Sequence, residues 1–319
     1  MKRHQQILAG ILVVQIILGV ITFWPRSGSA GAAQPVFPDL KVEDIVTLTI
    51  TDDKGAHIVL RRSGENWSLA EADDYPARAS SITPILDKFT QLNTATLVAR
   101  TESSHKALQV ADDNFLRRID IGMKDGTTHT FYLGSSPRYT ATHFRVAGQA
   151  ETYLTADLSA WEMNPAATSW IDTSYRSLDS AKVTEVTLQN ANGTFRLVKS
   201  GEQWTLADLA GDESIAPGKT ADIVNKAARI TLQRPLGLKE EASYGLATPA
   251  ATVTLTMEDG SVYTLRVGAK FDGSNYAVKA SESPYYVAVT EYNVKTLIEN
   301  DRAAFLEQAT PTPTPTAQP

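Results

Sequence analysis

Residues 63–70 read SGENWSLA, and residues 200–207 read SGEQWTLA. The two stretches share six of eight residues at an offset of 137, which chance does not easily explain. That offset is far longer than the roughly 20 to 50 residues of solenoid repeats, so it indicates two domain-sized copies. The sequence therefore predicts a tandem duplication, with a first domain at residues 41–162, a connector at 163–180 and a second domain at 181–305.

Shorter matches on both sides extend the duplication at slowly drifting offsets. Each joins apolar or turn residues of the first copy to similar residues of the second. The pairs are residues 46–48 with 186–188, Asp125 and Gly126 with Asp259 and Gly260, Leu133 and Gly134 with Val267 and Gly268, residues 144–146 with 276–278, and Tyr153 and Leu154 with Tyr286 and Val287. Such drift is expected where loops have gained or lost residues.

Within each copy, apolar residues recur with a period of two. Residues 252–257 read TVTLTM, and residues 119–123 repeat the alternation, which is typical of half-buried strands. The Asp-Gly pairs at 125–126 and 259–260 separate such runs and favour tight hairpin turns. The pattern therefore predicts consecutive antiparallel strands in both copies.

A helix is predicted after the Trp-containing strand of each copy. In the first copy, Thr83 is expected to cap the helix and Pro84 to take its first position, ahead of an apolar face that ends at Leu92. In the second copy, a weaker apolar stripe runs from Ile223 to Ile230.

Short helices are also expected to close the copies, near residues 155–161 and 291–299. The order of strands, helix, strands and helix lacks regular βαβ alternation. It predicts an α+β fold in which an N-terminal transmembrane helix precedes two tandem homologous domains of mainly antiparallel sheet with flanking helices.

Residues 7–24 (ILAGILVVQIILGVITFW) form an apolar run in which Gln15 is the only strongly polar side chain. As a helix this run spans about 27 Å, close to the hydrocarbon thickness of a bilayer. Lys2 and Arg3 precede it, so the positive-inside tendency places residues 1–6 in the cytoplasm. We expect a single-pass signal-anchor in the cytoplasmic membrane, with the bulk of the chain outside.

The alternative interpretation of this run is a secretory signal that is cleaved at Ala30 or Ala33. Residues 25–40 are small, unpatterned and contain prolines, so they are predicted to be a linker. Residues 306–319 contain alternating Thr and Pro, which favours polyproline II and cannot pack a core. This tail is expected to be disordered.

Composition excludes several kinds of chemistry. Lys and Arg number 30 against 36 Asp and Glu, a formal net charge of −6, which argues against nucleic-acid binding. The chain has no cysteine, which excludes disulfides, thiolate metal sites and a cysteine nucleophile.

The motifs predict no catalytic, cofactor-binding or metal-binding residue. Residues 218–220 (GKT) resemble the end of a phosphate-binding loop, but Glu213 stands where the first glycine is needed. Residues 103–106 contain Ser-x-x-Lys without the companion elements of serine enzymes. The five histidines are scattered, and the paired aspartates fall in turn-like segments. We therefore expect a protein that is not an enzyme and uses no cofactor, metal or nucleotide.

Trp67 and Trp204 are the strongest repeated residues. Each is followed two places on by a leucine in an expected strand, which favours a core anchor in equivalent buried sites of both copies. The alternative is a pair of exposed aromatic platforms for stacking a sugar. Exposure of the two indoles distinguishes these interpretations.

Together these residues resemble the bacterial family known as domain of unknown function 4340. The resemblance covers about 260 residues and rests on structural motifs, which in the second copy are Trp204 and Leu206, Tyr244, Gly245 and Leu246 with Pro249, Asp259 and Gly260, Gly268, Tyr276 and Tyr286. The first copy keeps Trp67, Leu69, Asp125, Gly126 and Gly134. It departs at residues 106–108 (Lys-Ala-Leu), where the Tyr-Gly-Leu turn is expected to have decayed.

The resemblance implies a membrane-anchored extracytoplasmic protein, and it implies for some members an association with ABC-type transport systems of the gliding-motility kind. We therefore expect a non-enzymatic binding protein that is accessory to an envelope or ABC-type transport complex, with a protein partner in the same membrane. The alternative function is an extracytoplasmic module that binds sugars or an envelope polymer.

Overall fold

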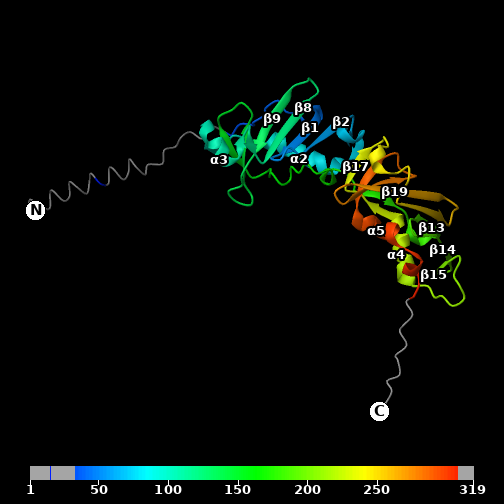
Figure 1. The fold of residues 1–319 in the computed structure, drawn as a ribbon. Helices are drawn as coiled ribbons and strands as arrows, with labels where there is room; N and C mark the ends of the chain where they lie inside the picture. The colour runs from blue at the N-terminus through cyan, green and yellow to red at the C-terminus, as the bar shows by residue number, and fades with distance from the viewer. Residues whose placement is uncertain (1–14, 16–32, 308–319) are drawn as a thin grey trace, which may run out of the picture.

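The computed structural model describes Gln15 and residues 33–307 (Figure 1). The expected cytoplasmic residues 1–6, the apolar run at 7–24 apart from Gln15, and the tail beyond residue 307 lie outside the described residues. Among the helices of the described part, none combines the length and the apolar character that crossing a bilayer requires. The signal-anchor therefore stays a prediction.

The first of two large sheets has nine strands, in the order β4-β3-β2-β1-β8-β9-β10-β11-β5. Its strands are β1 (Ile45–Asp52), β2 (His57–Ser63), β3 (Asn66–Leu69), β4 (Tyr75–Ala77), β5 (Leu97–Ala99), β8 (Arg117–Met123), β9 (Thr128–Leu133), β10 (Thr142–Val146) and β11 (Thr152–Thr155). Neighbouring strands are antiparallel throughout. The apolar side chains of the alternating runs, such as Ile119 and Ile121, are fully buried.

The second sheet has eight strands, in the order β15-β14-β13-β18-β19-β20-β21-β17. These are β13 (Val183–Asn190), β14 (Gly193–Ser200), β15 (Gln203–Leu206), β17 (Arg234–Gly237), β18 (Ala251–Met257), β19 (Val262–Asp272), β20 (Asn275–Ala280) and β21 (Tyr286–Thr290). Each strand has a counterpart in the first sheet, in the same order, and only β4 is left without one. The mainly antiparallel α+β class is therefore confirmed, whereas the residue limits of the domains stay predictions.

Short elements complete the fold. Two further sheets pair β6 (Val110–Ala111) with β7 (Asn114–Phe115) and β12 (Ser174–Ser177) with β16 (Arg229–Thr231). The helices are α2 (Ala79–Gln91), α3 (His105–Leu108), α4 (Pro217–Ala228) and α5 (Glu291–Glu299), and 3-10 turns lie at η1 (Val42–Asp44), η2 (Ala70–Ala72), η3 (Glu102–Ser104), η4 (Ala167–Ser169), η5 (Ser180–Lys182), η6 (Ala242–Tyr244) and η7 (Arg302–Phe305). In Figure 1 the two large sheets lie beside each other, with β17 at their junction and α4 and α5 together on one side of the second sheet.

Helix α2 presents the predicted apolar face to the first sheet, but it begins earlier than expected. Phe89 of α2 meets Phe131 of β9 with ring centroids 5.4 Å apart. The helix starts at Ala79, so Thr83 does not cap it and Pro84 lies inside it. The earlier start adds Ile82, which is fully buried, to the apolar face one turn toward the N-terminus.

The second predicted helix ends sooner than its apolar stripe. Ile223, Val224 and Ala227 are buried on α4, whereas Ile230 belongs to β16. The closing helix near 291–299 is confirmed as α5. The one expected near 155–161 is wrong, because Thr155 ends β11 and bends and a turn follow it. There the Glu162 carboxylate accepts hydrogen bonds from the backbone N–H and hydroxyl of Ser159, at 3.0 and 2.7 Å.

Strand pairing corrects three of the predicted repeat matches. In the first sheet Leu133 pairs with Phe144, and in the second Val267 pairs with Val278, so Phe144 corresponds to Val278. The match of residues 144–146 with 276–278 was therefore wrong by two residues, a shift that keeps side chains on the same face. By the same comparison of strand pairs, Leu48 corresponds to Val186 and not to Leu188. Tyr153 corresponds to Val287 and not to Tyr286.

The Tyr-Gly-Leu turn has a counterpart in the first copy, two residues later than predicted. Gly245 and Gln109 both adopt left-handed backbone, with φ of 63° and 56°. A Cβ placed on Gly268 would lie 1.9 Å from the Tyr244 carbonyl, and one on Gly134 would lie 2.1 Å from the Leu108 carbonyl. The turn is therefore kept in shape at residues 108–110, and only its side chains have changed.

Candidate binding site

The two repeated tryptophans occupy different environments. Trp67 is 4% exposed and belongs to the core, as predicted. Trp204 is only partly buried, packs against the edge of the core and lines a surface cavity. The prediction of two equivalent buried sites is therefore correct for Trp67 and wrong for Trp204.

The difference arises from the strand that borders each tryptophan. In the first copy β4 pairs with β3, and Ala77 lies opposite Trp67. In the second copy, the residues that precede α4 pair elsewhere. Ile215 forms a bridge with Leu306, the Ala216 N–H donates to the Phe305 carbonyl, and the Glu307 N–H donates to the Ser214 carbonyl, both at 2.8 Å. Residues 214–216 thus pair with residues 305–307 and not with β15. Strand β15 therefore remains at the edge of its sheet.

A cavity of about 900 Å³ lies beside this edge strand. Its walls come from the β14–β15 hairpin, from α4 and from the loop between β15 and α4. The lining residues are Ser180, Ala181, Lys199, Ser200, Glu202, Gln203, Trp204, Thr205, Leu209, Ser214, Ile215, Thr220, Ala221, Val224 and Asn225. One indole and a few aliphatic side chains are therefore surrounded by hydroxyl, amide and charged groups. We call this cavity and the free edge of β15 the Trp204 groove.

The backbone of β15 offers hydrogen-bonding groups at the groove. Residues of an antiparallel strand direct their N–H and carbonyl groups alternately toward the partner strand and away from it. The Ala207 N–H donates to the Arg196 carbonyl of β14 at 2.8 Å, so Trp204 and Leu206 direct theirs away from β14. The Leu206 carbonyl accepts from the Leu209 N–H at 3.2 Å, so the open part of the edge lies at Trp204. In the part of the chain that the structure describes, the backbone N–H and carbonyl of Trp204 have no hydrogen-bond partner.

Ionic contacts hold the walls of the groove in place. The Arg302 guanidinium pairs with Asp208 and with Glu213, both at 2.7 Å, which ties η7 to the loop between β15 and α4. The hydrogen bond from Arg302 lowers the pKa of Glu213 to about 2. The Lys199 ammonium donates to the Ala181 carbonyl at 2.8 Å. The groove is therefore built into the fold.

The other sequence motifs lie apart from one another. Residues 218–220 form the first turn of α4, where the fully buried Thr220 lines the Trp204 groove. Ser103 contacts the Thr101 hydroxyl at 3.0 Å in η3, while the Lys106 ammonium pairs with Asp113 at 2.7 Å. Within residues 33–307, no three His, Asp or Glu side chains gather in a group that could hold a metal ion.

Sequence reasoning missed one contact between a serine and a histidine. The Ser135 hydroxyl lies 3.1 Å from His143 Nδ1 and also donates to the Leu108 carbonyl at 3.1 Å. Burial lowers the pKa of His143, which favours the neutral ring. By strand register the second copy has Ala269 and Ala277 at these positions. The pair therefore connects the turn at residues 108–110 to the β9–β10 hairpin. Predicting this contact would have required the register of β9 against β10.

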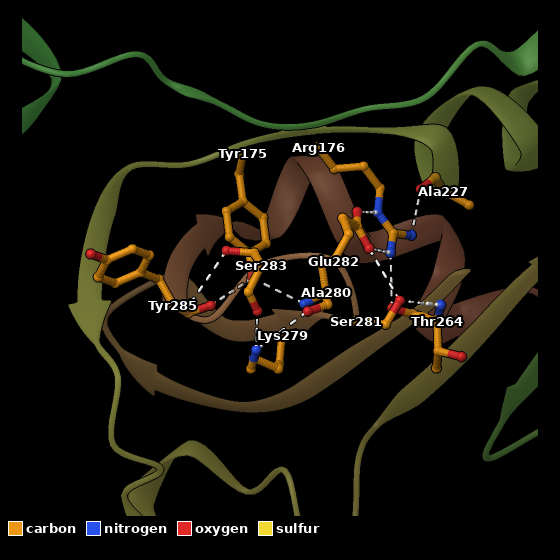
Figure 2. A network of polar contacts seen from close by, with 10 residues as sticks. All are labelled: Tyr175, Arg176, Ala227, Thr264, Lys279, Ala280, Ser281, Glu282, Ser283 and Tyr285. Carbon is orange, nitrogen blue, oxygen red and sulfur yellow. Dashed lines mark hydrogen bonds and ion pairs between the residues drawn. The ribbon is translucent and has the colours of Figure 1, made fainter. Parts of the chain in front are cut away.

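A polar network fixes the connector to the second sheet (Figure 2). Arg176 of β12 binds both carboxylate oxygens of Glu282, at 2.5 and 2.7 Å, and donates to the Thr264 and Ala227 carbonyls at 2.8 and 3.2 Å. The Tyr175 hydroxyl donates to the Tyr285 carbonyl at 2.7 Å and accepts from the Ala280 N–H at 3.0 Å. Of these residues, Tyr175 and Arg176 fall in the predicted connector at 163–180, and no role was predicted for them.

The same region joins the two sheets. Tyr75 of β4 packs edge-on against Tyr285, with ring centroids 4.7 Å apart, and burial raises the pKa of Tyr75 to about 12. The Leu238 N–H donates to the Asp73 carboxylate at 2.7 Å. A cavity of about 390 Å³ lies at this junction, where His57 contacts Glu71 at 3.0 Å.

Two large antiparallel sheets with a few helices define an α+β protein, and the open strand edge beside a mixed apolar and polar groove is its candidate binding site. The chain belongs to the family described as domain of unknown function (DUF4340), whose model matches residues 67–236, just over half of the chain. The match runs from Trp67 in β3 to β17, so it spans parts of both sheets. Comparisons with curated proteins and with solved structures each find no match.

Proposed function

We propose that this protein is a membrane-anchored, extracytoplasmic, non-enzymatic binding protein, accessory to an envelope or ABC-type transport complex. Residues 7–24 serve as its anchor, residues 1–6 lie in the cytoplasm, and both sheets lie outside. Its partner is a protein in the same membrane, which contributes an extended segment to the Trp204 groove.

The free edge of β15 is the observation that carries this proposal. Edge strands with unpaired backbone groups accept extended peptides by strand addition, in which main-chain hydrogen bonds give affinity and side-chain pockets give specificity. The first copy contains the filled arrangement, since β4 pairs with β3 there and Trp67 is buried. The second copy offers the same edge with the neighbouring position open.

Anchoring in the same membrane as the partner allows weak contacts to be sufficient for binding. The end of the predicted linker packs on the first sheet, because Phe37 and Leu40 are buried and the Val36 N–H donates to the Leu92 carbonyl at 2.8 Å. Treated as a flexible coil, residues 25–32 alone have a root-mean-square reach of roughly 14 to 17 Å. A partner in the same membrane would therefore meet the protein at a raised effective concentration. Removing residues 1–34 is expected to leave both sheets folded but to lose retention of the partner in cells.

The alternative function, binding of a sugar or envelope polymer, has its own support. Trp204 is partly exposed among hydroxyl and amide groups, including those of Gln203 and Asn225. An indole face next to hydrogen-bonding side chains can stack on a sugar ring and bind its hydroxyls. This support applies to the second copy alone, because Trp67 is buried.

A photo-crosslinking residue at Gln203 of the full chain tests the proposal. Asn66 is the matched control, because it is the exposed first residue of β3 as Gln203 is of β15. We expect a discrete protein adduct from position 203 that is absent from position 66 and abolished by Trp204→Ala. Retention of envelope saccharide instead of a protein would favour the alternative function. Equal adducts at both positions, or neither adduct nor saccharide, would overturn the proposal.

A further inference from the structure

We propose that Trp161 and the cavity beside it form a saccharide site next to helix α2, which binds a neutral sugar ring of an oligosaccharide or envelope polymer. The site is separate from the Trp204 groove and belongs to the other copy. The inference therefore goes beyond the proposed function and does not depend on it.

Trp161 is the most exposed tryptophan among the described residues, with 70% of its surface open to solvent. Within this part of the chain its ring meets no other ring or cation, and its indole N–H has no hydrogen-bond partner. Single exposed apolar side chains are common on protein surfaces. The informative feature is therefore what lies next to this one.

A cavity of about 430 Å³ lies against the indole of Trp161. Its volume falls within the roughly 300 to 1,000 Å³ that is usual for small-molecule sites. Ile85 of α2 and the buried Trp170 supply further apolar wall. The cavity thus has an aromatic face at its mouth and apolar surface behind it.

Polar side chains with unused hydrogen-bonding capacity surround this apolar wall. The Asn164 side-chain oxygen accepts from the Ala166 N–H at 2.9 Å, which leaves its two amide hydrogens for a ligand. The Ser81 hydroxyl accepts from Arg78 Nε at 2.8 Å and can still donate its own hydrogen. The Ser169 hydroxyl also lines the cavity. These groups bind hydroxyls and carry no charge.

The charge at the cavity is already neutralised. Glu162 is the one charged side chain among the lining residues, and it pairs with Lys88 of α2 and accepts two hydrogen bonds from Ser159. Burial alone would raise the pKa of Glu162, but these hydrogen bonds outweigh it and lower that pKa. A charged ligand therefore finds no free counter-ion there. The same contacts fix the residue that follows Trp161, so the indole is positioned before a ligand binds.

The second copy covers the corresponding aromatic ring. Lys88 and Lys226 lie in the last turns of α2 and α4, and α5 follows β21 as the segment with Trp161 follows β11. The Lys226 ammonium lies over the ring of Tyr292 of α5, 4.6 Å from its centroid. Because Lys88 pairs with Glu162 instead, the ring of Trp161 has no such cover. The open ring is thus a property of the first copy.

A neutral sugar ring matches this combination of groups. One face of a pyranose ring carries C–H groups that stack on an indole, while its hydroxyls bind amide and hydroxyl side chains around the rim. A polymer presents many such rings, which raises their effective concentration at the site. The structure therefore assigns an uncharged saccharide to this cavity.

Isothermal titration calorimetry of the full chain, in a detergent without a sugar headgroup, tests the site. The probes are chitohexaose, cellohexaose and maltohexaose, which are uncharged. We expect at least one to bind and Trp161→Ala to weaken that binding about tenfold or more, whereas Trp161→Phe keeps a ring and should weaken it less. Tyr292→Ala removes the exposed ring of the second copy and is the matched control, with unchanged affinity. No binding of any probe, or equal losses for Trp161→Ala and Tyr292→Ala, would overturn the inference.

Two further arms identify the source of the sugar and separate the two sites. Retention of the full chain on purified peptidoglycan sacculi, lost in Trp161→Ala, would identify a polymer, whereas probe binding without retention would identify a free oligosaccharide. Probe binding that survives Trp161→Ala but is lost in Trp204→Ala would belong to the Trp204 groove and overturn the inference. The Gln203 crosslinker reports on that groove alone, so a missing protein adduct would leave the Trp161 site intact.

Discussion

Arg176 and Glu282 form a two-pronged ion pair, with nitrogen to oxygen distances of 2.5 and 2.7 Å. The arginine side chain is fully buried, and the glutamate side chain is 26% exposed. Burial alone would raise the pKa of Glu282, but the hydrogen bonds and the charge of Arg176 outweigh it and lower that pKa. The pair anchors the connector strand β12 to the turn between β20 and β21.

Replacing Arg176 by methionine is expected to destabilise the protein strongly. The change leaves the Glu282 carboxylate without its counter-ion and removes donors from two carbonyls. We expect a loss of ~3 kcal/mol in the free energy of unfolding, the lower end for a broken buried pair, because Glu282 keeps contact with water. Urea denaturation measures it. Arg196→Met breaks the exposed pair with Glu185 and is the control, so equal small shifts for both variants would contradict this account.

Acid is expected to weaken the second sheet through its paired carboxylates. Glu213 has a folded pKa of about 2 against an ordinary value of 4.5, and Glu282 is also lowered. A carboxyl group with a depressed folded pKa stabilises the protein above its unfolded pKa and loses that contribution as pH falls through the folded value. The urea midpoint should therefore decline between pH 4.5 and about 2. Glu213→Gln should make this decline shallower, and an unchanged slope would contradict the assignment.

The two tryptophans are expected to differ in their contribution to stability. Trp67→Ala removes a core side chain and should cost about 3 to 5 kcal/mol. Trp204→Ala removes a partly exposed side chain beside an existing cavity and should cost markedly less. Chemical denaturation of the two variants checks this, with Trp67→Phe and Trp204→Phe as milder controls. Equal losses would mean that Trp204 is as buried in solution as Trp67.

Gly268 is expected to tolerate no side chain. A Cβ there would lie 1.9 Å from the Tyr244 carbonyl, and backbone of the left-handed turn cannot easily move away. Gly268→Ala should therefore lower the melting temperature clearly. Gly211→Ala is the matched control, since an added Cβ at Gly211 meets no atom within 4 Å. A melting temperature for Gly268→Ala that equals the control would show that the turn adapts.

The antiparallel hairpins could be predicted because their signals are local. Asp125 with Gly126, and Asp259 with Gly260, stand between alternating strands, and both turns form as expected. The register between copies was less accessible, because a shift of two residues leaves an alternating pattern unchanged. This is why the match at residues 144–146 failed while the Asp-Gly matches held.

The Trp204 groove could not be predicted from the repeat. The identical residues around Trp67 and Trp204 suggested identical environments. What separates them is the pairing of residues 214–216 with 305–307, between segments some 90 positions apart. Local sequence carries no record of such a pairing, and the same holds for the contact of Ser135 with His143, which needs the β9–β10 register.

Strand β4 has a second neighbour besides Trp67, because its Tyr75 also packs against Tyr285 of the other sheet. The segment thus serves two structures at once, so a change in β4 disturbs both the site of Trp67 and the joint between the sheets. The corresponding residues of the second copy have no third domain in the described chain to hold. Those residues pair with residues 305–307 instead, so the second copy keeps a surface at Trp204 that the joint between the sheets covers in the first copy.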